Sequence, residues 1–132
     1  MGAMPPAEHP VDPDQQPVSV VGAGAMGAGI AQVAAMAGHP VTLVDAVSGA
    51  AEDGVARIIA SLQRLEAVAE RLRTATHVED LPASALVVEA VREDLGTKQR
   101  LFEVLGTHQP DSTLLASNTS SLDISEIGRA HV

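Results

Sequence analysis

The stretch Val18–Gly27 reads VSVVGAGAMG and governs how the rest of the sequence is interpreted. Its first four residues, ended by a glycine, indicate a short and fully buried β-strand at 18–21. The next six fit the pattern G-x-G-x-x-G at the start of a helix expected over 25–37, which Gly38 and Pro40 would end. This pattern is weak in isolation, but its place between a strand and a helix predicts a loop whose backbone approaches a phosphate group.

Asp45 makes the interpretation of the glycine loop more specific. It ends a second β-branched strand, expected at 41–44, and stands 18 residues after Gly27. We expect Gly22 to permit the tight turn, Gly24 to admit a diphosphate close to the backbone, and Gly27 to allow the helix to pack against the strand. The diphosphate would lie on the N–H groups of the helix N-terminus, where the helix dipole favours negative charge.

The same aspartate favours NAD over NADP as the cofactor. Its carboxylate would accept hydrogen bonds from the adenosine ribose and repel a 2′-phosphate, and no arginine stands beside it in the sequence. The alternative is a purely structural glycine turn, with Asp45 as a helix cap.

The remaining periodicity predicts alternating helices and strands. We expect helices at 50–72 and 94–105, strands at 86–88 and 113–116, and a possible extended piece at 73–76. Alternation of this kind implies an α/β fold with a parallel sheet and right-handed crossovers. Residues 1–16 contain four prolines and are expected to form a disordered tail.

Composition excludes several classes of function. The formal net charge of −9 makes nucleic acid an improbable partner, and the absence of cysteine excludes disulfides, thiolate catalysis and cysteine-based metal sites. No metal site is expected. No apolar stretch approaches the roughly 20 residues of a membrane helix. The N-terminus lacks the features of a signal or transit peptide, so a soluble, cytoplasmic protein is expected.

Two strings in the second half carry a resemblance to a known family. Leu86–Leu95 reads LVVEAVREDL and Leu115–Leu122 reads LASNTSSL. Together with Gly22–Gln32, they resemble the NAD-binding domain of 3-hydroxyacyl-CoA dehydrogenases over about 18–127. The resemblance implies a Rossmann-type doubly wound parallel sheet at 17–127, incomplete at its C-terminal edge. It also implies NAD as cofactor, and oxidation of the 3-hydroxyl of an acyl-CoA such as 3-hydroxybutyryl-CoA in fatty-acid metabolism by an enzyme that is a homodimer when intact.

The resemblance also implies roles for individual residues. The set expected to bind the cofactor comprises Gly22, Ala23, Gly24, Ala25, Met26, Gly27, Asp45, Glu93, Lys98, Asn118 and Ser120. Ser120 would also hydrogen-bond the substrate as the catalytic serine, and Ser61 would lie near the CoA moiety. A solvated helix start is the alternative for Glu93 and Lys98, and a helix N-cap cluster for Asn118 and Ser120. Val68 replaces a CoA-contacting lysine of the family, and the helical hairpin is shorter than usual.

The family's catalytic histidine lies in a Leu-His-Phe-Phe-Asn-Pro segment that this sequence does not contain. We expect His39 and His108 at the opposite end of the sheet from the ligand, His77 in a surface loop and His9 in the tail. The end of the sequence resembles a translated sequencing adapter, so we expect 128–132 to be non-native, the natural chain to continue and this chain alone to be inactive. Strand 113–116 would then be an apolar sheet edge prone to self-association. The alternatives are a genuine short gene, a stand-alone, non-catalytic NAD-binding or regulatory module, and a related enzyme acting on small hydroxy acids.

Overall fold

The computed structural model describes residues 16–61 and 66–119. Strand β1 (Val18–Val21) leads through the glycine loop into helix α1 (Ala25–Met36), and β2 (Val41–Val44) follows. All four residues of both strands are buried, as expected for central strands of a parallel sheet. The first half of the chain therefore begins as the sequence predicts.

The segment after β2 differs from its prediction. In place of one helix over 50–72, the structure has α2 (Ala50–Ser61), a short α3 (Glu66–Ala69), strand β3 (Leu72–Ala75) and a 3₁₀ turn η2 (Val78–Asp80). The predicted helix ran too far because Leu72 is paired in register with Val41 of β2 and buried under the helices, so that sheet pairing overrides the local helical pattern. Within α2, Ile58 is buried, but the neighbouring apolar residue Ile59 is 44% exposed.

The second half contains β4 (Leu86–Glu89), α4 (Leu95–His108) and β5 (Leu114–Ser117). Asp94 precedes α4 as its N-cap, and the helix continues to His108, three residues beyond the expected end. Both strands end one residue later than predicted. That shift matters, because it assigns Glu89 to the end of β4 and Ser117 to the end of β5.

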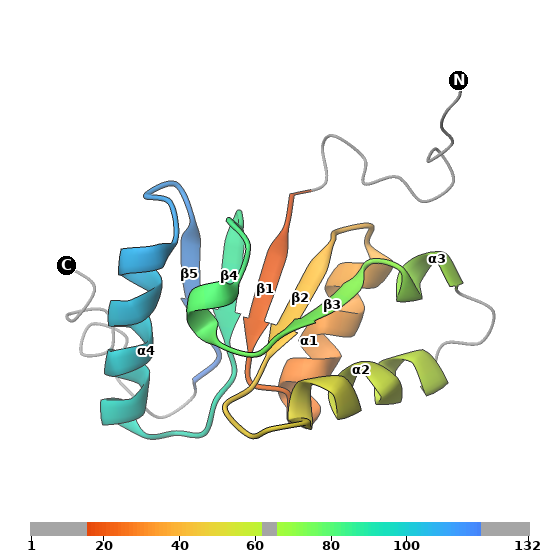
Figure 1. Cartoon of the computed structure of the whole chain (residues 1–132), viewed down its shortest axis with the longest axis horizontal. Coiled ribbons are helices and arrows are strands. Elements are labelled where there is room, and N and C mark those ends of the chain that lie inside the picture. Colours follow the sequence, from red (N-terminus) through yellow and green to blue (C-terminus); the bar gives the residue numbers. More distant parts are fainter. Residues whose placement is uncertain (1–15, 62–65, 120–132) are drawn as a thin grey trace.

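The strands form one all-parallel sheet in the order β3-β2-β1-β4-β5 (Figure 1). The order reverses between β1 and β4, which makes this pair the switch point where α/β proteins of this kind bind ligands. The predicted α/β, Rossmann-type fold is thus confirmed. None of the helices in the described ranges is long and apolar enough to cross a membrane.

Helices cover both faces of the sheet. On one face α1, α2 and α3 pack through small and β-branched residues, and on the other α4 and η2 pack through the only aromatic residue and several leucines. The first core includes Val20, Ala31, Ala35, Leu43, Ile58 and Leu72, and the second includes Val44, Leu81, Val87, Phe102 and Leu105. These layers hold the loops at the carboxyl ends of the strands in fixed positions.

Strand β5 is the outer strand of the described sheet, next to β4. Its first residue, Leu114, is 69% exposed, and a shallow apolar groove runs between this strand and the outer side of α1. Self-association through this edge remains a prediction.

Candidate functional site

A cleft of about 1100 Å³ lies at the carboxyl ends of the strands. Helices α1, α2 and α4 begin at this end of the sheet (Figure 1). Both halves of the fold line it. The first half contributes the glycine loop, Asp45 and the start of α2, and the second half contributes the turn after β4 and the start of α4. Lining residues include Gly22, Gly24, Asp45, Gly49, Ala90, Val91, Arg92 and Thr97.

The glycine loop has the conformation that its pattern predicts. Gly22 has a φ of +107°, and a Cβ atom there would lie 2.7 Å from the carbonyl oxygen of Ala90. A Cβ on Gly27 would lie 1.7 Å from the carbonyl oxygen of Gly22, so only glycine lets α1 approach β1 this closely. Gly22 therefore makes the turn and Gly27 makes the close packing.

Gly24 differs from the other two glycines because no atom of the described protein lies within 4 Å of the Cβ position. It is the N-cap of α1, no side chain caps the helix there, and the first turn carries no acidic residue. The N–H groups of a first helical turn have no partner within the helix and attract anions. An open approach to such a helix end fits a diphosphate, so the loop suits a dinucleotide.

Asp45 is tied to the loop from the end of β2. Its Oδ2 accepts a hydrogen bond from the N–H of Ala23 at 2.7 Å, and its Oδ1 accepts one from the N–H of Val47 at 2.8 Å. Helix α2 begins only at Ala50, and the two bonds do not run to its first turn, so they do not describe a helix cap. Each carboxylate oxygen keeps a second acceptor site, which leaves room for ribose hydroxyls.

An arginine reaches the glycine loop from α2. The guanidinium of Arg57 donates to the carbonyl oxygen of Ala23 at 2.8 Å. The sequence did not indicate this contact, because Arg57 lies 34 residues from Ala23. Helix α2 thus helps to fix the loop whose N–H binds Asp45.

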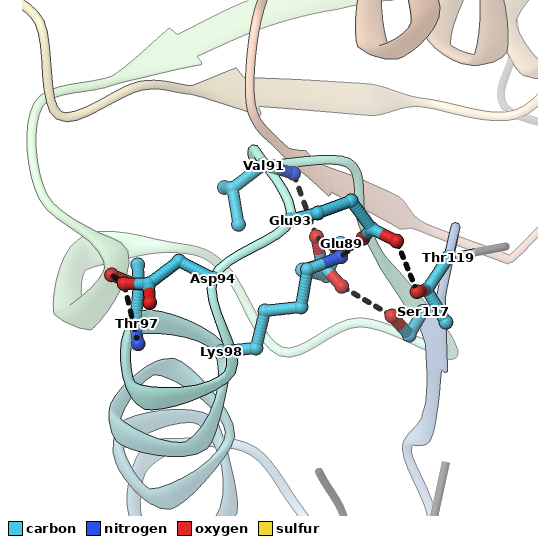
Figure 2. Close-up of polar contacts among 8 residues, drawn as sticks. All are labelled: Glu89, Val91, Glu93, Asp94, Thr97, Lys98, Ser117 and Thr119. Atoms are coloured by element: carbon cyan, nitrogen blue, oxygen red, sulfur yellow. Dashed lines mark hydrogen bonds and ion pairs between the residues drawn. The ribbon is translucent and has the colours of Figure 1, made fainter. Parts of the chain in front are cut away.

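From the sequence, Lys98 was expected to bind the cofactor or, alternatively, to belong to a solvated helix start. In the structure its side chain is completely buried. The ammonium nitrogen lies 2.9 Å from Oε2 of Glu89 and 2.7 Å from Oε1 of Glu93 (Figure 2). Burial alone would lower the pKa of Lys98, but the Glu93 and Glu89 carboxylates outweigh it and raise that pKa above its usual value. The alternative of a solvated helix start is therefore wrong for Lys98. Glu93 is 37% exposed, so its side chain is paired with Lys98 and also reaches solvent.

Glu89 is the residue that sequence reasoning missed. Its carboxylate is fully buried and accepts hydrogen bonds from the Val91 N–H, at 2.7 Å, and from the Ser117 hydroxyl (Figure 2). Thr119 similarly donates to Glu93 at 2.6 Å. One available signal was a glutamate that ends an apolar strand, nine residues before the only lysine of the chain.

The start of α4 is held by a local hydrogen-bonded cap. Asp94 accepts hydrogen bonds from the Thr97 hydroxyl and from the Thr97 N–H, at 3.2 Å for the latter. Both bonds stabilise the carboxylate and hold the pKa of Asp94 below its usual value. The cap fixes the first turn of α4 and with it the direction of Lys98.

Other predicted site residues lie apart from the contacts among Glu89, Glu93 and Lys98. The Ser61 hydroxyl donates to Ile58 O of its own helix, at the end of α2. His39 and His108 lie at the opposite end of the sheet, as predicted. His77 is exposed in the bend between β3 and η2, also as predicted, and it lines the cleft there. Asn118 is exposed just after β5, and Ser120 lies outside the described residues.

Comparisons with known proteins agree with this geometry. Residues 17–132 match the family model described as 3-hydroxyacyl-CoA dehydrogenase, NAD binding domain. A probable 3-hydroxybutyryl-CoA dehydrogenase of Bacillus subtilis (strain 168) is 38% identical over 121 residues, which cover 83% of this chain and 42% of that protein. A 3-hydroxyadipyl-CoA dehydrogenase of Escherichia coli (strain K12) is 43% identical over 123 residues, covering 85% and 26%.

The similarity extends to solved structures. The crystal structure of (S)-3-hydroxybutyryl-CoA dehydrogenase from Ralstonia eutropha superposes with a TM-score of 0.81 at 32% identity, over 89% of this chain and 45% of that one. The chain thus spans less than half the length of these relatives. NAD is the cofactor to which the matching domain family is assigned.

Proposed function

Because the chain belongs to the family of 3-hydroxyacyl-CoA dehydrogenases through its NAD-binding domain, we propose that it binds NAD across the switch point between β1 and β4. We propose further that the protein of which this domain is part oxidises the 3-hydroxyl group of a 3-hydroxyacyl-CoA to a ketone.

The composition of the cleft carries this proposal, since its two halves suit the two halves of a dinucleotide. The uncapped start of α1 suits the diphosphate, and Asp45 suits the adenosine ribose. In this arrangement the nicotinamide half lies over β4 and β5. Glu93 and Asn118 are then the exposed residues on that side, and Lys98, whose buried ammonium lies 2.7 Å from Glu93, holds the Glu93 carboxylate in place.

When bound, NAD supplies the hydride acceptor of the reaction. Oxidation breaks the C–H bond at carbon 3 and transfers the hydride to NAD, while the hydroxyl proton passes to a base. We propose that Ser120 hydrogen-bonds the substrate beside the nicotinamide and that Ser61 contacts the CoA moiety. The histidines of the described part do not lie at the carboxyl ends of β4 and β5, so we propose that the base comes from outside the described residues.

A chimera tests whether this domain supports that chemistry. Residues 17–119 would replace the matching segment of the Ralstonia eutropha (S)-3-hydroxybutyryl-CoA dehydrogenase, and turnover of 3-hydroxybutyryl-CoA with NAD would be followed by NADH formation. We expect measurable turnover from the chimera and none from the 132-residue chain alone. The same chimera carrying Gly27→Ala serves as a control and should be inactive, because the added Cβ meets the Gly22 carbonyl.

A chimera that folds, binds NADH and still shows no turnover would contradict the proposed reaction while leaving NAD binding intact. Turnover by the 132-residue chain alone would contradict the assignment of the base to residues outside the described part.

A further inference from the structure

Helix α2 packs against the glycine loop through one of its faces. Gly54 and Arg57 are three residues apart in this helix, so they lie on the same side of it. A Cβ atom on Gly54 would lie 3.3 Å from the carbonyl oxygen of Ala23 and 3.0 Å from Cδ2 of Leu43, so the missing side chain lets the helix approach the loop closely. The guanidinium of Arg57 donates to the same carbonyl oxygen at 2.8 Å.

Ala23 is held by a second contact from the other direction along the backbone. Its N–H donates to Oδ2 of Asp45 at 2.7 Å, while its carbonyl accepts from Arg57. These two groups belong to successive peptide units, the first joining Gly22 to Ala23 and the second joining Ala23 to Gly24. Asp45, at the end of β2, therefore fixes the first unit, and helix α2 fixes the second.

The second of these peptide units leads directly into α1. It is trans and planar, so its C=O and N–H point in opposite directions. Since the Ala23 carbonyl is directed to Arg57, the Gly24 N–H is directed away from α2. Gly24 lines the cleft and is the N-cap of α1, whose first N–H groups have no partner within the helix.

We propose that Arg57 is a positioning residue for cofactor binding, which holds the Ala23–Gly24 peptide so that the start of α1 is presented to the diphosphate. This inference rests on the proposed function. Arg57 is not among the described residues that line the cleft, so it acts through the backbone and not as a phosphate ligand. Loss of its hydrogen bond should weaken NADH binding about threefold to tenfold, the range that one hydrogen bond contributes.

The test measures Kd for NADH by nicotinamide fluorescence with the 132-residue chain, at about 0.1 M and about 1 M salt. A direct attraction between Arg57 and the diphosphate would be screened at the higher concentration, whereas a hydrogen bond to the backbone would persist. Arg57→Met removes the donor and keeps an apolar stem. Arg57→Ala, which introduces the best helix former, decides the matter if Arg57→Met does not fold. Arg57→Lys keeps a donor on a long side chain.

Arg71→Met is the matched control for the loss of an arginine that donates to a backbone carbonyl. Arg71 donates to the carbonyl oxygen of Ala35 in α1 at 3.1 Å, just before β3 at the opposite end of the sheet. Urea unfolding of each variant separates an effect on stability from an effect on binding.

We expect Arg57→Met to raise Kd about threefold to tenfold at both salt concentrations and Arg57→Lys to raise it less. Arg71→Met should lower the free energy of unfolding and leave Kd unchanged. An unchanged Kd in the folded Arg57→Met or Arg57→Ala chain would overturn the inference. So would a loss of affinity that disappears at high salt, an equal loss in Arg57→Lys, or an equal loss in Arg71→Met. Each of these results leaves the proposed function standing, because the unchanged chain still binds NADH, whereas failure of the unchanged chain to bind NADH would overturn both.

Discussion

Replacing Gly24 with alanine should weaken NADH binding without unfolding the chain. Gly24 is the N-cap of α1 with φ −69° and ψ −169°, a conformation that alanine adopts without strain. Its Cβ would meet no described protein atom within 4 Å, but it would enter the space that the diphosphate must occupy. The substitution therefore separates ligand binding from folding.

The expected changes in Kd and in the free energy of unfolding follow from the space around Gly24 and from its backbone conformation. An extra methyl group forced into a filled site costs about 1–3 kcal/mol, which corresponds to about 5-fold to 140-fold in Kd. For stability, alanine is a poorer N-cap than glycine, which costs up to about 1 kcal/mol. The reduced freedom of the unfolded chain offsets about 0.4–1 kcal/mol of that loss. The free energy of unfolding should thus change by less than about 1 kcal/mol.

The assay combines a nicotinamide fluorescence titration with urea unfolding followed by circular dichroism. Gly29→Ala on the same helix is the matched control, because its Cβ also meets no described atom but points away from the loop. It should stabilise the helix by about 0.5–1 kcal/mol and leave Kd unchanged. If Gly24→Ala binds NADH as tightly as the unchanged chain, the diphosphate does not lie on this loop and the reasoning is refuted.

Three further predictions concern the buried polar groups. Lys98→Met should lower the free energy of unfolding by about 3 kcal/mol, since it leaves Glu89 buried without its counter-charge; a loss below about 1 kcal/mol in urea unfolding would contradict this. Because folding raises the pKa of Lys98, the stability that Lys98 contributes should be constant below about pH 10.5 and decline above it. Urea unfolding of the unchanged chain and of Lys98→Met from pH 8 to 11 would measure this; a stability difference between the two that grows with pH would contradict it. Gln109→Ala should lower the free energy of unfolding by about 1–3 kcal/mol, because the Gln109 amide accepts from the Ser84 N–H and donates to the Pro82 carbonyl. It should leave Kd for NADH unchanged, since these contacts lie at the opposite end of the sheet; a change in Kd would contradict this.

The fold was largely predictable because local signals and sheet pairing agree along most of the chain. The glycine loop is the clearest case, since the steric reasons for Gly22 and Gly27 are also the reasons for the sequence pattern. The helix predicted over 50–72 failed where those signals conflict. Val68 and Leu72 continue the helical spacing of apolar residues, but Leu72 lies in β3, beside Val41.

The candidate site was only partly predictable for a different reason. Asp45 and the loop are recognisable because their spacing is fixed by one strand–helix–strand unit. Glu89 of β4 contacts Lys98 of α4 and Ser117 of β5, and Ser117 lies 28 residues from Glu89 in the sequence. A buried charge at a strand end is also uncommon unless it is paired. That pairing becomes visible only once the three elements are brought together.

The most direct test of the account is a titration of NADH into the purified 132-residue chain. The sequence has no Trp and no Tyr, so nicotinamide fluorescence can be followed without emission from those residues. The account predicts a saturable change with one site per chain, and binding of NADPH that is much weaker because Asp45 repels the 2′-phosphate. A chain that is folded by circular dichroism and gives no change with NADH would contradict the central claim that this cleft binds NAD.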